Sequence, residues 1–91
     1  MTLLWTAAAA DDLARLHDFL AAVNAPAAAS VIQSLTTAAR RLIERPRLGV
    51  RLEEFGGREV RRLIVGIYEV RYEVSGEDLF ILRLWHTREK R

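Results

Sequence analysis

The 91-residue sequence contains no cysteine. A disulfide framework, a thiolate nucleophile and a cysteine-ligated zinc or iron–sulfur site are therefore excluded. The opening stretch, MTLLWTAAAADD, has no basic residue, and Asp11 and Asp12 interrupt its apolar run. This pattern is typical of neither a secretory signal nor a transmembrane span. We expect a soluble protein without a cleaved leader, and the lack of cysteine fits a cytoplasmic location.

Two common catalytic signatures are also missing. The sequence has neither a glycine-rich phosphate loop nor a G-x-S-x-G nucleophile elbow. It has only two histidines, His17 and His86, and their spacing does not suggest metal ligands. His17 stands beside Asp18 in a predicted helix, where we expect a solvated surface position. The sequence therefore predicts no cofactor and no metal.

The composition is that of one small folded domain, which we predict to span residues 1–91. Hydrophobic residues make up 51% and charged residues 29% of the chain. Residues 1–39 hold one arginine against three aspartates, whereas residues 40–91 hold thirteen basic against nine acidic residues. Thirteen of the fourteen basic residues are arginines, which bind carboxylates and phosphates bidentately. We expect an acidic partner, unless the glutamates of the same half neutralise these arginines internally; those glutamates are Glu53, Glu54, Glu59, Glu69, Glu73 and Glu77.

The first half of the chain predicts a short strand and two helices. Residues 2–5 form an apolar run, and Thr6 is a suitable N-cap for a helix that starts at Ala7. Asn24 and Pro26 mark the boundary between this helix and a second one, which ends near Pro46. Both helices carry apolar residues at helical spacing: Leu13, Leu16, Leu20 and Val23 in the first, and Ala28, Ile32, Leu35, Ala39, Leu42 and Ile43 in the second. So short a connection predicts an antiparallel helical hairpin.

The second half changes from a helical period to alternation. Residues 60–65, 67–74 and 79–85 are rich in β-formers and are separated by turn signals, which predicts a three-stranded antiparallel meander. The fold class is therefore α+β: an N-terminal strand and an antiparallel helical hairpin packed on an antiparallel sheet of about four strands. The last strand is apolar on both sides, as expected of a central strand. Strict alternation places Phe80, Leu82 and Leu84 on one face, and Leu79, Ile81, Arg83 and Trp85 on the other.

Alternation in the middle strand predicts one packed and one charged face. Tyr68, Val70, Tyr72 and Val74 share the packed face, and Ile67, Glu69, Arg71 and Glu73 share the other. Arg71 and Arg83 then lie on one face with Glu69 and Glu73 near them, as either a cross-strand ion-pair ladder or an anion-binding surface. Arg61 and Arg62 point to opposite faces, so one of them joins this group.

The end of the last strand carries two further candidates. His86 lies among arginines, where an imidazole can act as an acid or base on a phosphodiester, or can simply pack against or cap the strand end. Trp85 is either a core residue or, if partly open, an anchor for a protein partner. We expect the tail from Arg88 to Arg91 to be mobile unless a partner holds it.

Three segments carry a resemblance to a known family: ERPRLG (44–49), EVRRLIVGIYEVRYEV (59–74) and LFILRLWHTR (79–88). A helix that ends in a Pro-x-x-Gly turn, an "R-x-L-x-V…Y-x-V-x-Y" hairpin and a last strand that ends in "R-x-x-H-x-R" are found together in the RelE/ParE superfamily of toxins. The chain resembles this superfamily over nearly its whole length. The resemblance implies a type II toxin–antitoxin module that arrests growth and stabilises plasmids.

Members of the superfamily have one of two activities. ParE-like toxins bind and inhibit DNA gyrase, whereas RelE-like toxins cleave mRNA on the ribosome with basic residues and an aromatic or His near the C-terminus. The cleaving members commonly have Arg directly after the aromatic that matches Tyr68; this sequence has Glu69, and no Tyr follows Arg88. We therefore favour the ParE-like activity.

The ParE-like reading implies a gyrase target and a cognate antitoxin, which we expect to be a ribbon-helix-helix DNA-binding protein. It needs no catalytic residue, and the target-binding candidates are Arg62, Arg71, Arg83, Trp85, His86 and Arg88. The alternative is a ribosome-dependent mRNA endoribonuclease with a catalytic set of His86, Arg71, Arg83 and Arg88. A plain RNA-binding or scaffolding module is a third possibility.

Overall fold

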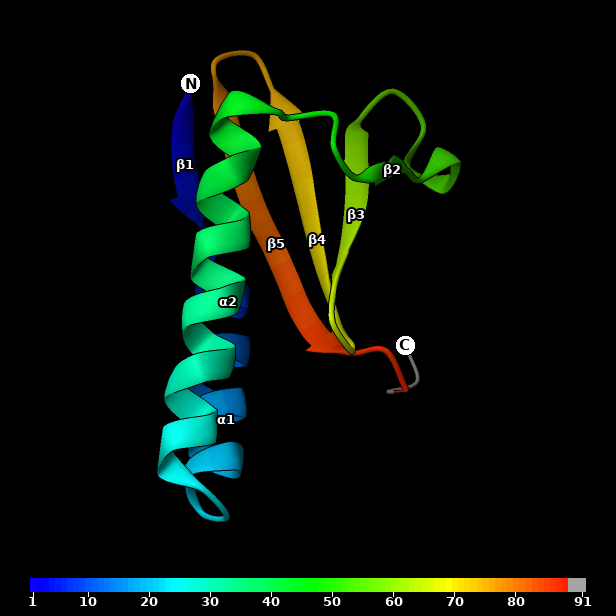
Figure 1. The fold of residues 1–91 in the computed structure, drawn as a ribbon. Helices are drawn as coiled ribbons and strands as arrows, with labels where there is room; N and C mark the ends of the chain where they lie inside the picture. Colours follow the sequence, from blue (N-terminus) through cyan, green and yellow to red (C-terminus); the bar gives the residue numbers. More distant parts are fainter. Residues whose placement is uncertain (89–91) are drawn as a thin grey trace.

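The computed structural model describes residues 1–88, and residues 89–91, part of the tail expected to be mobile, lie outside the described residues. Two helices lie against one side of a sheet (Figure 1). The elements follow one another in the order β1 (Thr2–Trp5), α1 (Ala7–Ala21), α2 (Ala25–Glu44), β2 (Val50–Arg51), the 3₁₀-helix η1 (Glu53–Phe55), β3 (Glu59–Val65), β4 (Tyr68–Ser75) and β5 (Asp78–His86). The predicted strand, helical hairpin and meander are all present.

Side chains cap both helices at their N-termini. The hydroxyl of Thr6 accepts a hydrogen bond of 3.1 Å from the amide of Ala9, which confirms Thr6 as the N-cap of α1. Asn24 does the same for α2 through the amide of Ala27. The apolar stripe predicted for α1 ends earlier than expected, because Val23 lies beyond the helix and is 84% exposed. Within residues 1–88, neither helix combines the length and the apolar character that crossing a membrane requires.

The sheet has five strands in the order β1-β5-β4-β3-β2. This differs from the prediction in two ways. β1 pairs with β5 in parallel, so the sheet is mixed rather than antiparallel. The second difference is β2, whose two residues pair with Arg61 and Arg62 of β3; so short a strand has no alternation that could reveal it. β5 lies between β1 and β4, as its apolar character on both sides predicts.

A β-bulge interrupts the pairing of β4 with β5. Arg71 pairs with Arg83, but the next residue, Tyr72, pairs with Ile81, so Leu82 has no partner on β4. A bulge adds one residue to one strand and thereby reverses the faces of all residues that follow. We call the side of the sheet that packs on the helices the helix face, and the opposite side the outer face.

The faces predicted for β5 are therefore wrong beyond Ile81. Leu84 lies on the helix face and is 3% exposed, although strict alternation places it with Phe80. Arg83 and Trp85 lie on the outer face with Phe80 instead of sharing a face with Ile81. The bulge thus brings a leucine into the core and turns a charged residue out of it.

The core lies between the helix face and the two helices. Tyr68, Val70 and Tyr72 of β4 contribute to it, as predicted, and Val74 packs against its edge. Alanines on the helices reach complete burial, which lets the helices approach closely. The largest fully buried side chains are Tyr72, Leu35, Leu42, Leu79, Ile81 and Val70 in this core, and Val60 on the outer face, where it pairs with Glu73.

Tyr72 also fixes the loop between α2 and β2. Its hydroxyl accepts a hydrogen bond from the amide of Gly49 at 2.8 Å and donates one to the carbonyl of Pro46 at 2.7 Å. A Cβ atom at Gly49 would lie 2.6 Å from the carbonyl oxygen of Arg62 and 2.8 Å from the Tyr72 ring, so only glycine fits there. The Pro-x-x-Gly segment is therefore held by a buried tyrosine.

Candidate interaction surfaces

Three arginines form a row across the outer face. Arg62 pairs with Arg71, and Arg71 pairs with Arg83, on three adjacent strands. Arg71 and Arg83 share a face, as predicted, and Arg62 is the member of the Arg61–Arg62 pair that joins them. Arg61 lies on the helix face, where it donates to the carbonyl of Gly49 at 2.8 Å.

Two of these three arginines form ion pairs with carboxylates of the same chain. Arg71 donates to Glu69 of its own strand at 3.0 Å, and Arg83 donates to Asp12 of α1 at 2.7 and 3.1 Å. Arg62 is exposed and makes no ion pair within residues 1–88. The row is thus neither the cross-strand ladder of the prediction nor an open cluster of three cations.

Glu73 is paired with an arginine outside the row. Arg58, in the loop before β3, donates two hydrogen bonds to its carboxylate at 3.1 and 2.7 Å. The hydrogen bond and the attraction of Arg58 outweigh the effect of burial and lower the pKa of Glu73 below its ordinary value. The glutamates of the C-terminal half therefore neutralise part of its arginines, the alternative that the sequence left open.

Two aromatic rings enclose the Arg71 guanidinium. Its central carbon lies 4.6 Å from the ring centre of Trp85 and 5.7 Å from that of Phe55, within the range of cation–π attraction. Trp85 is only 7% exposed, so it packs as a core residue of the outer face and is not an open anchor. The Nε atom of Arg71 is buried without a hydrogen-bond partner in residues 1–88. Arg71 thus holds the η1 loop, which carries Phe55, against the sheet.

Asp12 of α1 binds β5, a contact that the sequence does not predict. It lies past the first turn of α1, and its side chain is 2% exposed. Its carboxylate accepts from the guanidinium of Arg83 and, at 2.9 Å, from the amide of Leu84; it also pairs with Arg15. Burial raises the pKa of Asp12, but the hydrogen bonds from Arg83 and Leu84 and the attraction of both arginines outweigh it and lower that pKa overall.

These contacts close an open edge of the sheet. β1 pairs with β5 only as far as Ile81, so among residues 1–88 no strand lies beside the backbone of β5 beyond that point on this side. Thr6 donates to the carbonyl of Leu82 at 3.0 Å, and Asp12 accepts from Leu84. The start of α1 therefore takes the place of a strand along this edge.

His86 packs at the end of β5 on the helix face. It pairs with Tyr68, its ring meets that of Tyr68 edge to face at 5.7 Å, and its Nδ1 accepts a hydrogen bond from the amide of Arg88 at 3.0 Å. These contacts match the packing and capping role. Because Arg71 and Arg83 lie on the outer face, the register does not bring the four residues of the alternative catalytic set to one face.

His17 occupies a surface position and lies 3.3 Å from the carboxylate of Asp18, as predicted for a solvated histidine. In the part of the chain that the structure describes, no three histidine, aspartate or glutamate side chains are placed to hold a metal ion.

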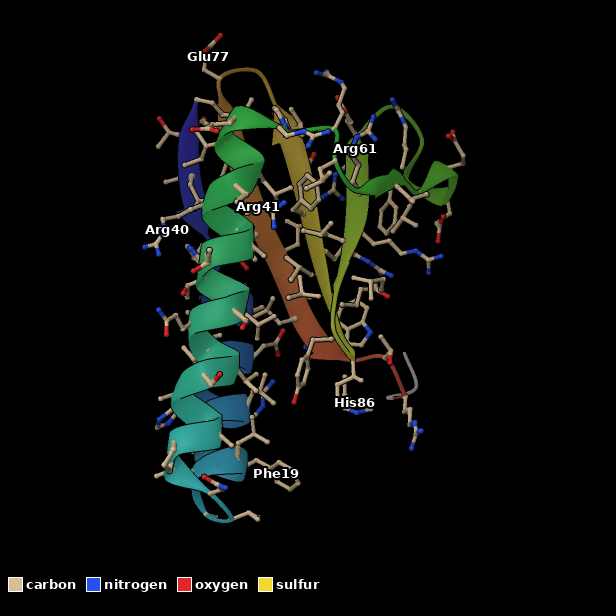
Figure 2. All side chains as sticks on the ribbon, in the orientation of Figure 1. Phe19, Arg40, Arg41, Arg61, Glu77 and His86 are labelled. Atoms are coloured by element: carbon tan, nitrogen blue, oxygen red, sulfur yellow. The ribbon has the colours of Figure 1, made fainter. Side chains whose placement is uncertain are left out.

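A groove runs between α2 and β3. It has a volume of about 580 Å³, with polar residues of α2 on one wall and apolar residues on the other. Ser34, Thr37 and Arg41 belong to the polar wall, and Leu63 and Val65 to the apolar one. Since β2 pairs only with residues 61 and 62, residues 63–65 of β3 have an open backbone edge. In the view of Figure 2, the Arg41 side chain lies on the side of α2 towards the sheet.

Comparisons with known proteins agree with this architecture. The family model of the ParE toxin of type II toxin-antitoxin systems, parDE, matches residues 3–91. Among solved structures, a chain of the chromosomal ParDE TA system from P. aeruginosa superimposes with a TM-score of 0.79 and 27% sequence identity, over 94% of this chain and 95% of that one. A comparison with curated proteins gives no match.

Proposed function

Because the chain belongs to the ParE toxin family of type II toxin–antitoxin systems, we propose that it inhibits DNA gyrase by binding it in the cytoplasm, and that a cognate ribbon-helix-helix antitoxin neutralises it. The toxin role and the antitoxin partner follow from the family. The proposal adds the target, the mode of action by binding alone, and the class of antitoxin.

The proposal favours binding over catalysis because His86 and the paired arginines Arg71 and Arg83 lie on different faces of the sheet. Cleavage of a phosphodiester requires a proton-transfer group and cations that converge on the same reacting atoms. Here His86 ends on the helix face, whereas Arg71 and Arg83 lie on the outer face. Both arginines are also held by carboxylates, which offset the charge that a transition state would need. This arrangement supports inhibition by binding.

The groove between α2 and β3 is the surface best suited to the antitoxin. It presents an open strand edge at residues 63–65 next to the apolar side chains of Leu63 and Val65. An added strand or an amphipathic helix can bind such a surface. Arg41 lines the groove and makes no ion pair within residues 1–88, so an acidic residue of the antitoxin would meet it favourably.

The target is tested with purified components. We expect the toxin to block supercoiling by DNA gyrase at stoichiometric concentrations, addition of the antitoxin to restore it, and mRNA on translating ribosomes to stay intact. Normal supercoiling at saturating, folded toxin rejects the gyrase proposal. The endoribonuclease alternative predicts the reverse: ribosome-dependent cleavage that His86→Ala abolishes.

A further inference from the structure

The helical hairpin extends past the end of the sheet. In Figure 1 the C-terminal part of α1 and the start of α2 continue beyond the last residues of β5. Leu16 and Phe19, three residues apart, lie on one side of the C-terminal half of α1, and Val23 follows the C-cap residue Ala22. Phe19 is 72% exposed and Val23 84%. Phe19 is the most exposed aromatic residue in the described chain, and aromatic residues are enriched in protein–protein interfaces relative to the rest of the surface.

The overhang and the strand end form a groove, which we call the α1–β5 corner. Its volume is about 280 Å³, and its lining consists of Asp12, Arg15, Leu16, Phe19, Leu84, Trp85 and His86. Figure 2 shows Phe19 extending from α1 on the same end of the molecule as His86. The corner thus has an apolar wall of Leu16 and Phe19 that faces Leu84.

The lining of the α1–β5 corner holds one arginine, Arg15, and one carboxylate, Asp12, and only the arginine is exposed. Arg15 and Arg83 share the single carboxylate of Asp12, so two guanidinium groups meet one negative charge. The side chain of Arg15 is 68% exposed, and Arg88 at the strand end is exposed as well. Asp12 is the one acidic residue of the lining, and its side chain is 2% exposed. An apolar partner that carries a carboxylate complements this surface.

We propose that the α1–β5 corner is the surface with which the toxin binds its protein target, through an acidic and apolar segment of that target anchored on Phe19. The inference rests on the proposed function in that it takes the target to be gyrase. An aromatic anchor beside arginine is the composition of binding hot spots. The corner is also separate from the groove between α2 and β3, so target and antitoxin use different surfaces.

The test replaces Phe19 by glutamate, with Phe19→Ala as a milder variant. Phe19 is exposed, so we expect both variants to fold, as circular dichroism and thermal unfolding will show. Val50→Glu is the matched control, because Val50 is 64% exposed and lies in β2, away from the corner. Each variant is measured for growth arrest on expression, for inhibition of supercoiling and for affinity to the antitoxin.

We expect Phe19→Glu to lower the potency of growth arrest and of gyrase inhibition at least about tenfold, which corresponds to a hot-spot residue. Antitoxin affinity should stay within about threefold of wild type, and Val50→Glu should keep full potency. Unchanged potency of Phe19→Glu, or a parallel loss of antitoxin affinity, overturns the inference. If wild type arrests growth without affecting supercoiling, gyrase is rejected as target, whereas a loss of growth arrest in Phe19→Glu still supports the corner.

Discussion

Substitution of Asp12 by asparagine tests whether α1 is fastened to the sheet edge by charge. Asn keeps the shape of the side chain and one oxygen that can accept from the amide of Leu84. It removes the negative charge that Arg83 and Arg15 share. The variant therefore isolates the charged part of the contact from the packing of α1.

The expected cost follows from the burial of the two partners. A hydrogen bond to a charged group contributes about 1.5–3 kcal/mol. The side chain of Asp12 is 2% exposed, but that of Arg83 is 38% exposed, so water can reach the arginine once its partner is neutral. We therefore expect the lower part of that range, about 2 kcal/mol of unfolding free energy. In a domain of this size this lowers Tm by roughly 8–16 °C.

The pH dependence supplies a second readout. The pKa of Asp12 is lowered in the folded state, so its stabilising effect is fully present above the ordinary pKa of an aspartate, about 3.9, and is lost as pH falls through the folded-state value. Urea unfolding should show a constant difference between wild type and Asp12→Asn from pH 5 to 7, and a smaller one below about pH 4. Arg15→Ala is the control, with a change within about 0.5 kcal/mol. An Asp12→Asn variant as stable as this control at pH 7 would refute the reasoning.

Three further substitutions test other contacts of the fold. Gly49→Ala should destabilise the domain by about 1–3 kcal/mol, because its Cβ collides with the backbone of Arg62 and the ring of Tyr72, and thermal unfolding measures this. Tyr72→Phe should cost about 1–3 kcal/mol in urea unfolding, since it leaves a buried amide and a carbonyl without their partner. Arg58→Ala should leave the urea midpoint nearly unchanged despite its two hydrogen bonds to Glu73, because its side chain is 55% exposed and water screens the pair; a clear drop of the midpoint contradicts this.

The elements that the sequence predicts correctly are those with a strong local cause. The cap Thr6 works through its side-chain oxygen and the amide three residues later, which is a property of a few neighbouring residues. The alternation of β4 is likewise local, and it places Val70 and Tyr72 in the core as predicted. The Gly66 turn also needs no distant contact, because glycine alone provides its positive φ of 62° without strain.

The features that the sequence does not predict depend on distant parts of the chain. The sequence pattern of β5 does not reveal the bulge at Leu82. The strand is apolar on both sides, so leucines are buried whether or not the alternation shifts. Its position follows from contacts with α1: Thr6 binds the carbonyl of Leu82, and Asp12 binds the amide of Leu84. Asp12 and Arg83 are 71 residues apart, so no local pattern could link them.

This long-range pairing changes what the arginine content means for function. From the sequence, Arg71 and Arg83 are candidates for an anion-binding surface. In the fold, each forms an ion pair with a carboxylate of the same chain. The cations left for a partner are those outside such pairs, such as Arg62 on the outer face and Arg41 at the groove between α2 and β3, both without an ion pair within residues 1–88. The electrostatic attraction that brings a partner to a surface depends on charge that remains uncompensated there. A partner that carries carboxylates is therefore attracted by unpaired arginines such as Arg62 and Arg41, and less by Arg71 and Arg83, whose charges are compensated within the chain.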